Sequence, residues 1–204
     1  MTVNQLALAP SRHRSLTVSG AIGIGYTLSW IAGLSIPAPN PSFTATNPQI
    51  TTALAGHGAG VALQFALTEG LPAIGIAAVS VLLARAARSR LALITGLTAA
   101  AISVVMFALG LALVTTAHPG LYHVIDRMDG VKMLLLAVLG IAGATAAVLP
   151  RWLRYAGAAL AVSIAVSGLA YLLLLPSLSA AAAPGLIFLL VFITGSGLVL
   201  GKTR

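Results

Sequence analysis

The chain contains no cysteine, and only 7% of its 204 residues are charged. The first absence excludes disulfides, thiolate catalysis, cysteine-based metal sites and c-type haem attachment. The second excludes an ordinary soluble domain, since such domains carry about 25% charged residues. With 59% hydrophobic residues, the composition instead indicates a protein whose solvent is the lipid bilayer.

Apolar runs of about 20 residues, the length that spans a bilayer, occupy most of the sequence. We therefore predict an all-α, polytopic membrane helix bundle that forms a single integral membrane domain over residues 1–204. The expected transmembrane helices are residues 16–36, 56–84, 91–115, 131–148, 155–175 and 185–200. Between them we expect a proline-rich loop over residues 37–55 and a polar loop over residues 116–130.

Basic residues are distributed unevenly between the two predicted membrane faces. An inner N-terminus places nine of the 11 Lys and Arg residues inside: Arg12, Arg14, Arg85, Arg88, Arg90, Arg151, Arg154, Lys202 and Arg204. The outer segments then hold Arg127 and Lys132. The positive-inside rule favours this orientation, so we predict a cell-membrane protein with both termini cytoplasmic. The net charge of +8 is thereby explained by topology, and we expect no nucleic-acid partner.

Acidic residues are even scarcer, and the chain has only Glu69, Asp126 and Asp129. Glu69 lies about 13 residues into the second predicted helix, or roughly 20 Å from its outer end. An ionisable group near the middle of the membrane is a candidate functional residue. Because no Lys or Arg lies within an apolar run, we expect Glu69 to be unpaired, neutral and able to donate a proton. The alternative is a neutral Glu69 bonded to a neighbouring helix beside an ordinary kink at Pro72.

Polar residues at spacings of three and four indicate a stripe along the second predicted helix, formed by His57, Gly60, Gln64 and Thr68. The stripe would lead from the outer surface towards Glu69. Equally, Gln64 and Thr68 could simply hold neighbouring helices together.

A second polar cluster lies in the predicted outer loop and comprises His118, Tyr122, His123, Asp126 and Asp129. A metal site is conceivable from these residue types, but the cluster lacks the tight ligand spacing of known metal motifs, so we expect no metal. The cluster could hold the polar head of a substrate, and the alternative is a solvated surface with Asp–Arg pairs that include Arg127. Aromatic residues make up only 5% of the chain. We expect Tyr26, Trp30 and Phe65 to line a pocket near Glu69, although Trp30 could instead be an interfacial anchor.

Motifs for nucleotide binding and for diphosphate-bound metal are absent from the sequence. A pair of facing haem-ligating histidines is also unavailable, because His57, His118 and His123 lie near the outer helix ends. We therefore expect no cofactor.

Two short segments carry a family resemblance: Leu67-Thr68-Glu69-Gly70, and Asp126-Arg127-Met128-Asp129-Gly130-Val131-Lys132. Together with the size and the absence of cysteine, they resemble the integral-membrane terpene cyclases, which include fungal meroterpenoid and actinobacterial drimentine-type enzymes. The resemblance implies an isomerase that protonates an alkene or epoxide of a lipophilic prenylated substrate without metal or cofactor. Glu69 would be the proton donor. Members of the family usually pair two acids, and the second here would be Asp126 or Asp129.

Two other functions remain open from the sequence. A proton-coupled small transporter would need polar residues from Glu69 to both faces, whereas the second helix is apolar below Glu69 until Ser80. A non-catalytic membrane scaffold would have Glu69 enclosed by helix contacts and no pocket. The cyclase hypothesis instead predicts an apolar pocket of a few hundred Å³ beside Glu69. The sequence does not determine the oligomeric state.

Overall fold

The computed structural model describes residues 17–201 and is all-helical over that range. The α-helices are α1 (Val18–Leu34), α2 (Asn47–Leu54), α3 (Gly58–Phe65), α4 (Leu71–Ala87), α5 (Arg90–Thr116), α6 (Gly120–Thr145), α7 (Arg151–Leu173) and α8 (Ala182–Leu200). A π-helix, η1 (Ala66–Gly70), joins α3 to α4, and a 3₁₀ segment, η2 (Pro176–Ala181), precedes α8.

Five helical segments are long and apolar enough to cross a membrane: Gly58–Ala87, Arg90–Thr116, Gly120–Thr145, Arg151–Leu173 and Pro176–Leu200. α1 is also apolar but spans 17 residues. The prediction of a helical membrane bundle is therefore confirmed. The first predicted residue of α1, Leu16, and the basic residues Arg12, Arg14, Lys202 and Arg204 lie outside the described residues.

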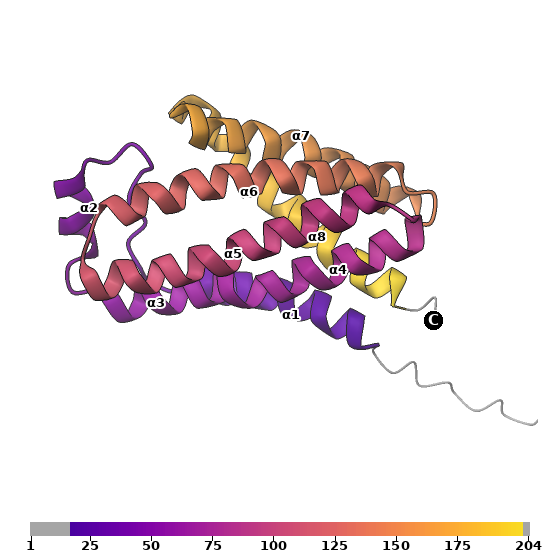
Figure 1. Ribbon diagram of the computed structural model, residues 1–204, viewed down its shortest axis with the longest axis horizontal. Coiled ribbons are helices and arrows are strands. Elements are labelled where there is room, and N and C mark those ends of the chain that lie inside the picture. The colour runs from indigo at the N-terminus through magenta and orange to yellow at the C-terminus, as the bar shows by residue number, and fades with distance from the viewer. Residues whose placement is uncertain (1–16, 202–204) are drawn as a thin grey trace, which may run out of the picture.

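The long helices form a ring in which α1 packs against α4, and α4 to α8 each pack against the next helix along the chain. α8 closes the ring against α1. Figure 1 shows the α4–α5 and α6–α7 turns at one end of the bundle, which is also the end where α8 finishes. We call this the basic end, because its turns carry Arg85, Arg88, Arg90, Arg151 and Arg154. The opposite end, with α2 and the α5–α6 turn, is called the acidic end because Asp126 and Asp129 lie on its side of the bundle.

Glycines bring the backbones of α6 and α7 into direct contact at two levels. A Cβ atom on Gly140 would lie 2.7 Å from the Gly157 carbonyl oxygen, and one on Gly168 would lie 2.9 Å from that of Gly130. Side chains larger than hydrogen have no room at these positions, which is how small residues permit close packing of membrane helices. The two contacts fix the position of α7 relative to α6 along most of their length.

Two predicted loops contain helix. α6 begins at Gly120, so most of the predicted loop 116–130 is helical and the predicted start at residue 131 is wrong. The apolar run defined that start, but the first turns of α6 carry polar side chains that face other helices rather than lipid. The predicted loop 37–55 likewise contains α2, whose first turn is stabilised by the Gln49 side chain accepting a hydrogen bond from the Thr46 amide at 2.8 Å.

Candidate functional site

The π-helix η1 interrupts the second transmembrane segment at the level of Glu69. Its backbone hydrogen bonding is displaced by one residue, so that the Leu71 amide donates to the Ala66 carbonyl. Pro72 follows in the first turn of α4 and has no amide hydrogen to give to the Thr68 carbonyl. Short π-helices within α-helices frequently mark functional sites. Here the segment directs Glu69 into the bundle, where its side chain is buried.

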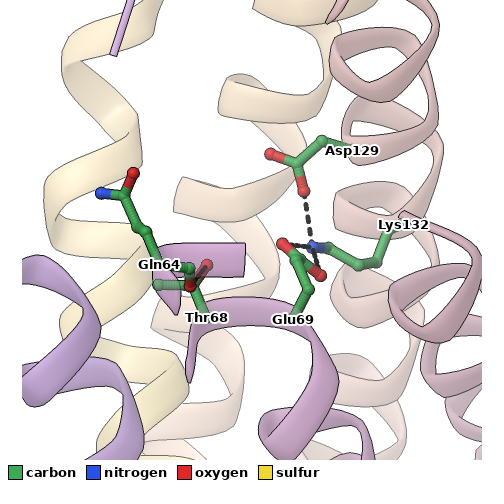
Figure 2. Close-up of polar contacts among 5 residues, drawn as sticks. All are labelled: Gln64, Thr68, Glu69, Asp129 and Lys132. Carbon is green, nitrogen blue, oxygen red and sulfur yellow. Dashed lines mark hydrogen bonds and ion pairs between the residues drawn. The ribbon is translucent and has the colours of Figure 1, made fainter. Parts of the chain in front are cut away.

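Glu69 is paired with a lysine, and the prediction of an unpaired acid is therefore wrong. The Lys132 Nζ atom donates to both Glu69 carboxylate oxygens, at 2.7 and 2.8 Å. It also lies 2.7 Å from Oδ1 of Asp129, one turn earlier on α6. Figure 2 shows the three side chains converging from two helices. On α5, the buried Ser103 hydroxyl is a further hydrogen-bond partner of Glu69. We call Glu69, Asp129 and Lys132 the ion cluster.

Matching depth brings Glu69 and Lys132 together. Glu69 is 11 residues beyond Gly58, where α3 begins, and Lys132 is 12 beyond Gly120, where α6 begins. Both helices run inward from the acidic end, so both residues lie about 17 Å deep at 1.5 Å per residue. Lys132 was assigned to the outer surface because the helix start was placed too late. Its spacing of three from Asp129 was the available signal.

A cavity of about 250 Å³ lies beside the ion cluster. Its lining brings together six of the predicted site residues, namely Glu69, Asp126, Asp129, Trp30, Phe65 and Tyr122. Twelve further residues that were not predicted also line it: Asn40, Met106, Ile125, Lys132, Met133, Leu136, Ile164, Ser167, Tyr171, Ala182, Leu186 and Leu189. Most of these are apolar and had no feature to distinguish them from lipid-facing residues. The cavity thus brings Glu69 together with Tyr122, Asp126 and Asp129 of the second polar cluster.

Three polar atoms on the cavity wall have no hydrogen-bond partner among residues 17–201. They are Oδ2 of Asp126, Oγ of the fully buried Ser167 on α7, and Nε1 of Trp30. Buried polar atoms nearly always have partners, so these three atoms are available to a molecule within the cavity. Arg127, which neighbours Asp126, is turned away: its guanidinium donates to the carbonyls of Tyr171 and Leu172 at the end of α7.

The proline-rich segment after α1 covers the cavity at the acidic end. The Tyr122 hydroxyl donates to the Pro41 carbonyl at 2.6 Å and also contacts Oδ1 of Asn40 at 3.1 Å. The Phe43 ring packs on Tyr171, with ring centroids 4.7 Å apart. Asn40, Tyr122 and Tyr171 all line the cavity, so these contacts hold the segment against its wall.

Five predicted site residues lie outside the cavity lining: Tyr26, His57, Gln64, His118 and His123. Tyr26 is buried against Gly75, with its hydroxyl near the Trp30 indole. His57 and His118 are exposed. His123 contacts Asn47 at 3.1 Å and lines a separate surface hollow next to Asp126.

The predicted polar stripe does not lead to Glu69. The Thr68 methyl group packs on Gly33 of α1, and the Thr68 hydroxyl donates to the Gln64 carbonyl. Figure 2 shows Gln64 and Thr68 apart from the ion cluster. Successive residues of a helix differ by about 100° in direction, so Glu69 points to α6 while Thr68 points to α1.

The arrangement suits acid–base chemistry more than metal chemistry. Over residues 17–201, no three His, Asp or Glu side chains come together to hold a metal ion. Lys132 already occupies the space between Glu69 and Asp129. What the cavity offers is three carboxyl groups, one ammonium group and aromatic rings.

Comparisons with known proteins give no assignment. No protein-family model matches the chain, and neither a curated protein nor a solved structure matches it. The structure by itself supports a multi-pass helical membrane protein whose bundle contains a mostly apolar cavity with three carboxyl groups on its wall.

Proposed function

We propose that this protein is a membrane-embedded cyclase that protonates a carbon–carbon double bond of a lipophilic prenylated substrate. One observation carries the proposal: a single cavity within the bundle combines three carboxyl groups with the rings of Trp30, Phe65, Tyr122 and Tyr171. Alkene protonation needs an acid shielded from water, which would otherwise capture the cation. Aromatic faces stabilise positive charge nearby.

Charge balance favours Asp126 over Glu69 as the proton donor. Of the residues that line the cavity, three carry carboxyl groups and only Lys132 is basic. The ammonium of Lys132 contacts Glu69 and Asp129, which favours their charged forms. Asp126 makes no such contact and lies one turn from Asp129 on α6. A like charge nearby favours a protonated acid. In this scheme the ion cluster provides a fixed negative environment for the cation.

The proposed reaction is an isomerisation. The proton of the Asp126 carboxyl adds to one carbon of a substrate alkene, which leaves a cation on the other carbon. The π electrons of a second alkene in the prenyl chain then form the new ring bond and move the cation along the chain. Loss of a proton from an adjacent carbon to a cavity carboxylate gives a new alkene. Substrate and product therefore have the same mass, and no metal, oxidant or cofactor is consumed.

The positive-inside rule supports an orientation in the cell membrane with the basic end in the cytoplasm. The turns at that end carry five arginines, whereas Lys132 lies within a membrane span and no longer counts as an outer-loop charge. This leaves Arg127 as the basic residue near the outer face over residues 17–201. The termini are then cytoplasmic, and the cavity lies nearer the outer leaflet.

Two other functions make different predictions for the same protein. The scaffold hypothesis is favoured by the Lys132–Glu69 pair, because an acid satisfied by its neighbours needs no chemical role. It gives no account of the cavity or of Asp126. A proton-coupled transporter would also use Asp126, but it would move a solute without changing its structure.

The test is to supply membranes containing the protein with geranylated and farnesylated phenols and indoles. Products are followed by chromatography coupled to mass spectrometry, since retention time distinguishes isomers of equal mass. We expect a new isomer with the wild type and a loss of at least about 100-fold with Asp126→Asn, the size typical of removing a general acid. His118→Asn, an exposed change at the same end, serves as the control and retains activity. An unchanged product level in Asp126→Asn, or no isomer from any of these substrates, would contradict the proposal.

A further inference from the structure

The hydrogen-bonding groups on the cavity wall are unequally available. The Lys132 ammonium has three N–H donors, and it faces three carboxylate oxygens, two on Glu69 and one on Asp129. The nearby Arg127 is occupied by the carbonyls at the end of α7. A molecule in the cavity therefore meets no free cationic donor among the described residues, which disfavours phosphate, sulfate or carboxylate groups.

Acceptors, in contrast, remain free. Oδ2 of Asp126 and Oγ of the fully buried Ser167 have no partner in the part of the chain that the structure describes, and both residues line the cavity. The indole Nε1 of Trp30, also without a partner there, is an uncharged donor on the same wall. The two groups come from different helices, α6 and α7. The helices touch at Gly130 and Gly168, so that Ser167 lies at about the level of Asp129. The free acceptors therefore face one space from two sides.

The remaining wall also suits a positive charge. Trp30, Phe65, Tyr122 and Tyr171 line the cavity, and aromatic faces attract cations. The two carboxylates of the ion cluster outnumber its single ammonium group, so the cluster is negative whether or not Asp126 holds a proton. Apolar residues such as Leu136, Leu186 and Leu189 complete the lining.

We propose that this cavity is a binding site for a lipophilic primary amine, whose ammonium group donates to Asp126 and Ser167. A volume of about 250 Å³ is below the roughly 300–1,000 Å³ of typical ligand pockets, so the site takes the head and the first part of an alkyl chain. The inference shares its cavity with the proposed cyclisation but does not depend on it, because it concerns binding without turnover.

The two tryptophans of the chain provide a direct measurement. Trp30 lines the cavity, whereas Trp152 begins α7 at the basic end and is exposed. In Trp152→Phe the fluorescence comes from Trp30 alone. This variant, purified as the full chain in non-ionic detergent, is titrated at pH 7 with decylamine, decanol and decanoate, which share a chain length and differ in head group.

We expect decylamine to change the Trp30 emission with a half-saturation concentration about tenfold below that of decanol, since hydrogen bonds to charged groups are the stronger ones. Decanoate should give no saturable change. Adding Asp126→Asn should remove the preference for decylamine and leave decanol unaffected. Ser167→Ala deletes only an unpartnered hydroxyl and should weaken decylamine binding about threefold. This milder variant provides a second test if Asp126→Asn fails to fold.

Equal binding of decylamine and decanol would overturn the inference, as would saturable decanoate binding or an unchanged amine preference in a folded Asp126→Asn. His118→Asn, outside the cavity, is the control and should bind decylamine as the parent does. Failure here is distinct from failure of the proposed function. Asp126-dependent cyclisation without amine preference refutes only the ligand class, and amine binding without any isomer refutes only the cyclase.

Discussion

The two halves of the bundle are built differently. Towards the basic end the interior is almost entirely apolar, and its larger cluster includes Leu83, Leu139, Leu153, Leu160 and Phe192. Towards the acidic end the apolar cluster is smaller, and it shares the interior with the cavity and the ion cluster. Close packing in the basic half thus holds the helices in position. The acidic half contains the polar groups, whose positions depend on that packing.

The sharpest test of the acidic half is Lys132→Met. It leaves Glu69 and Asp129 buried without their cation, and breaking a buried ion pair in this way costs about 3–5 kcal/mol. We expect a loss of that size in the free energy of unfolding, measured by denaturant titration of the purified protein in detergent. Combining it with Glu69→Gln should recover at least half of the loss. A cost below about 1 kcal/mol for the single change would mean that water stabilises the carboxylates.

The corresponding test of the basic half is Gly140→Ala. The added Cβ would lie 2.7 Å from the Gly157 carbonyl oxygen, and overpacking of this kind costs about 1–3 kcal/mol. Gly25→Ala is the matched control, because nothing lies within 4 Å of its Cβ position. It should be neutral or stabilise α1 by up to about 1 kcal/mol. If both changes have the same effect on the thermal midpoint, close packing does not hold α6 against α7.

A smaller effect is expected for Tyr122→Phe. The change removes the hydroxyl that donates to Pro41 and contacts Asn40, at a cost of about 1 kcal/mol. The effect should be local, so hydrogen exchange should rise in residues 35–46 and stay unchanged in α7 and α8. Uniformly faster exchange throughout the bundle would show that Tyr122 supports the whole fold rather than the covering segment.

The smallest effect is expected for Arg127→Gln. Its guanidinium donates to the Tyr171 and Leu172 carbonyls at the end of α7, and a cation at a helix C-terminus contributes about 0.3–1 kcal/mol. We expect a thermal midpoint lowered by an amount of that order, with decylamine binding unchanged. Weaker amine binding in this variant would indicate that Arg127 acts on the cavity after all.

Much of the architecture could be predicted from the sequence, because helices that cross a bilayer must be apolar over about 20 residues. Composition and apolar runs therefore identify them. The same criterion failed at α6. Its first three turns carry Tyr122, Asp126 and Asp129, which lowered the local hydrophobicity although the segment is helical and faces the bundle. Because α6 begins at residue 120 rather than at the predicted residue 131, Lys132 lies inside the bundle and not at the surface. There it pairs with Glu69.

Site residues were predictable where chemistry alone identified them. Glu69, Asp126 and Asp129 are the chain's only acids, and all three line the cavity. Tertiary placement was not predictable. Ser167 resembles any serine in an apolar helix, and Tyr26 resembles Trp30, yet Ser167 faces the cavity while Tyr26 packs on Gly75. Which side of a helix faces a cavity depends on the neighbours, and a single sequence does not contain that information.

The π-helix at Ala66–Gly70 has a consequence for the length of the chain itself. Such a segment holds one residue more than regular α-helical winding requires, so the parts of the span before and after it are out of phase by about 100°. Deleting one residue, for instance Leu67, would restore regular winding and turn either α3 or α4 about its axis. The Glu69–Lys132 contact therefore constrains how many residues this span can contain. An insertion or deletion here would rotate one part of the span relative to the other, and so separate the two side chains, rather than simply change the length of the span.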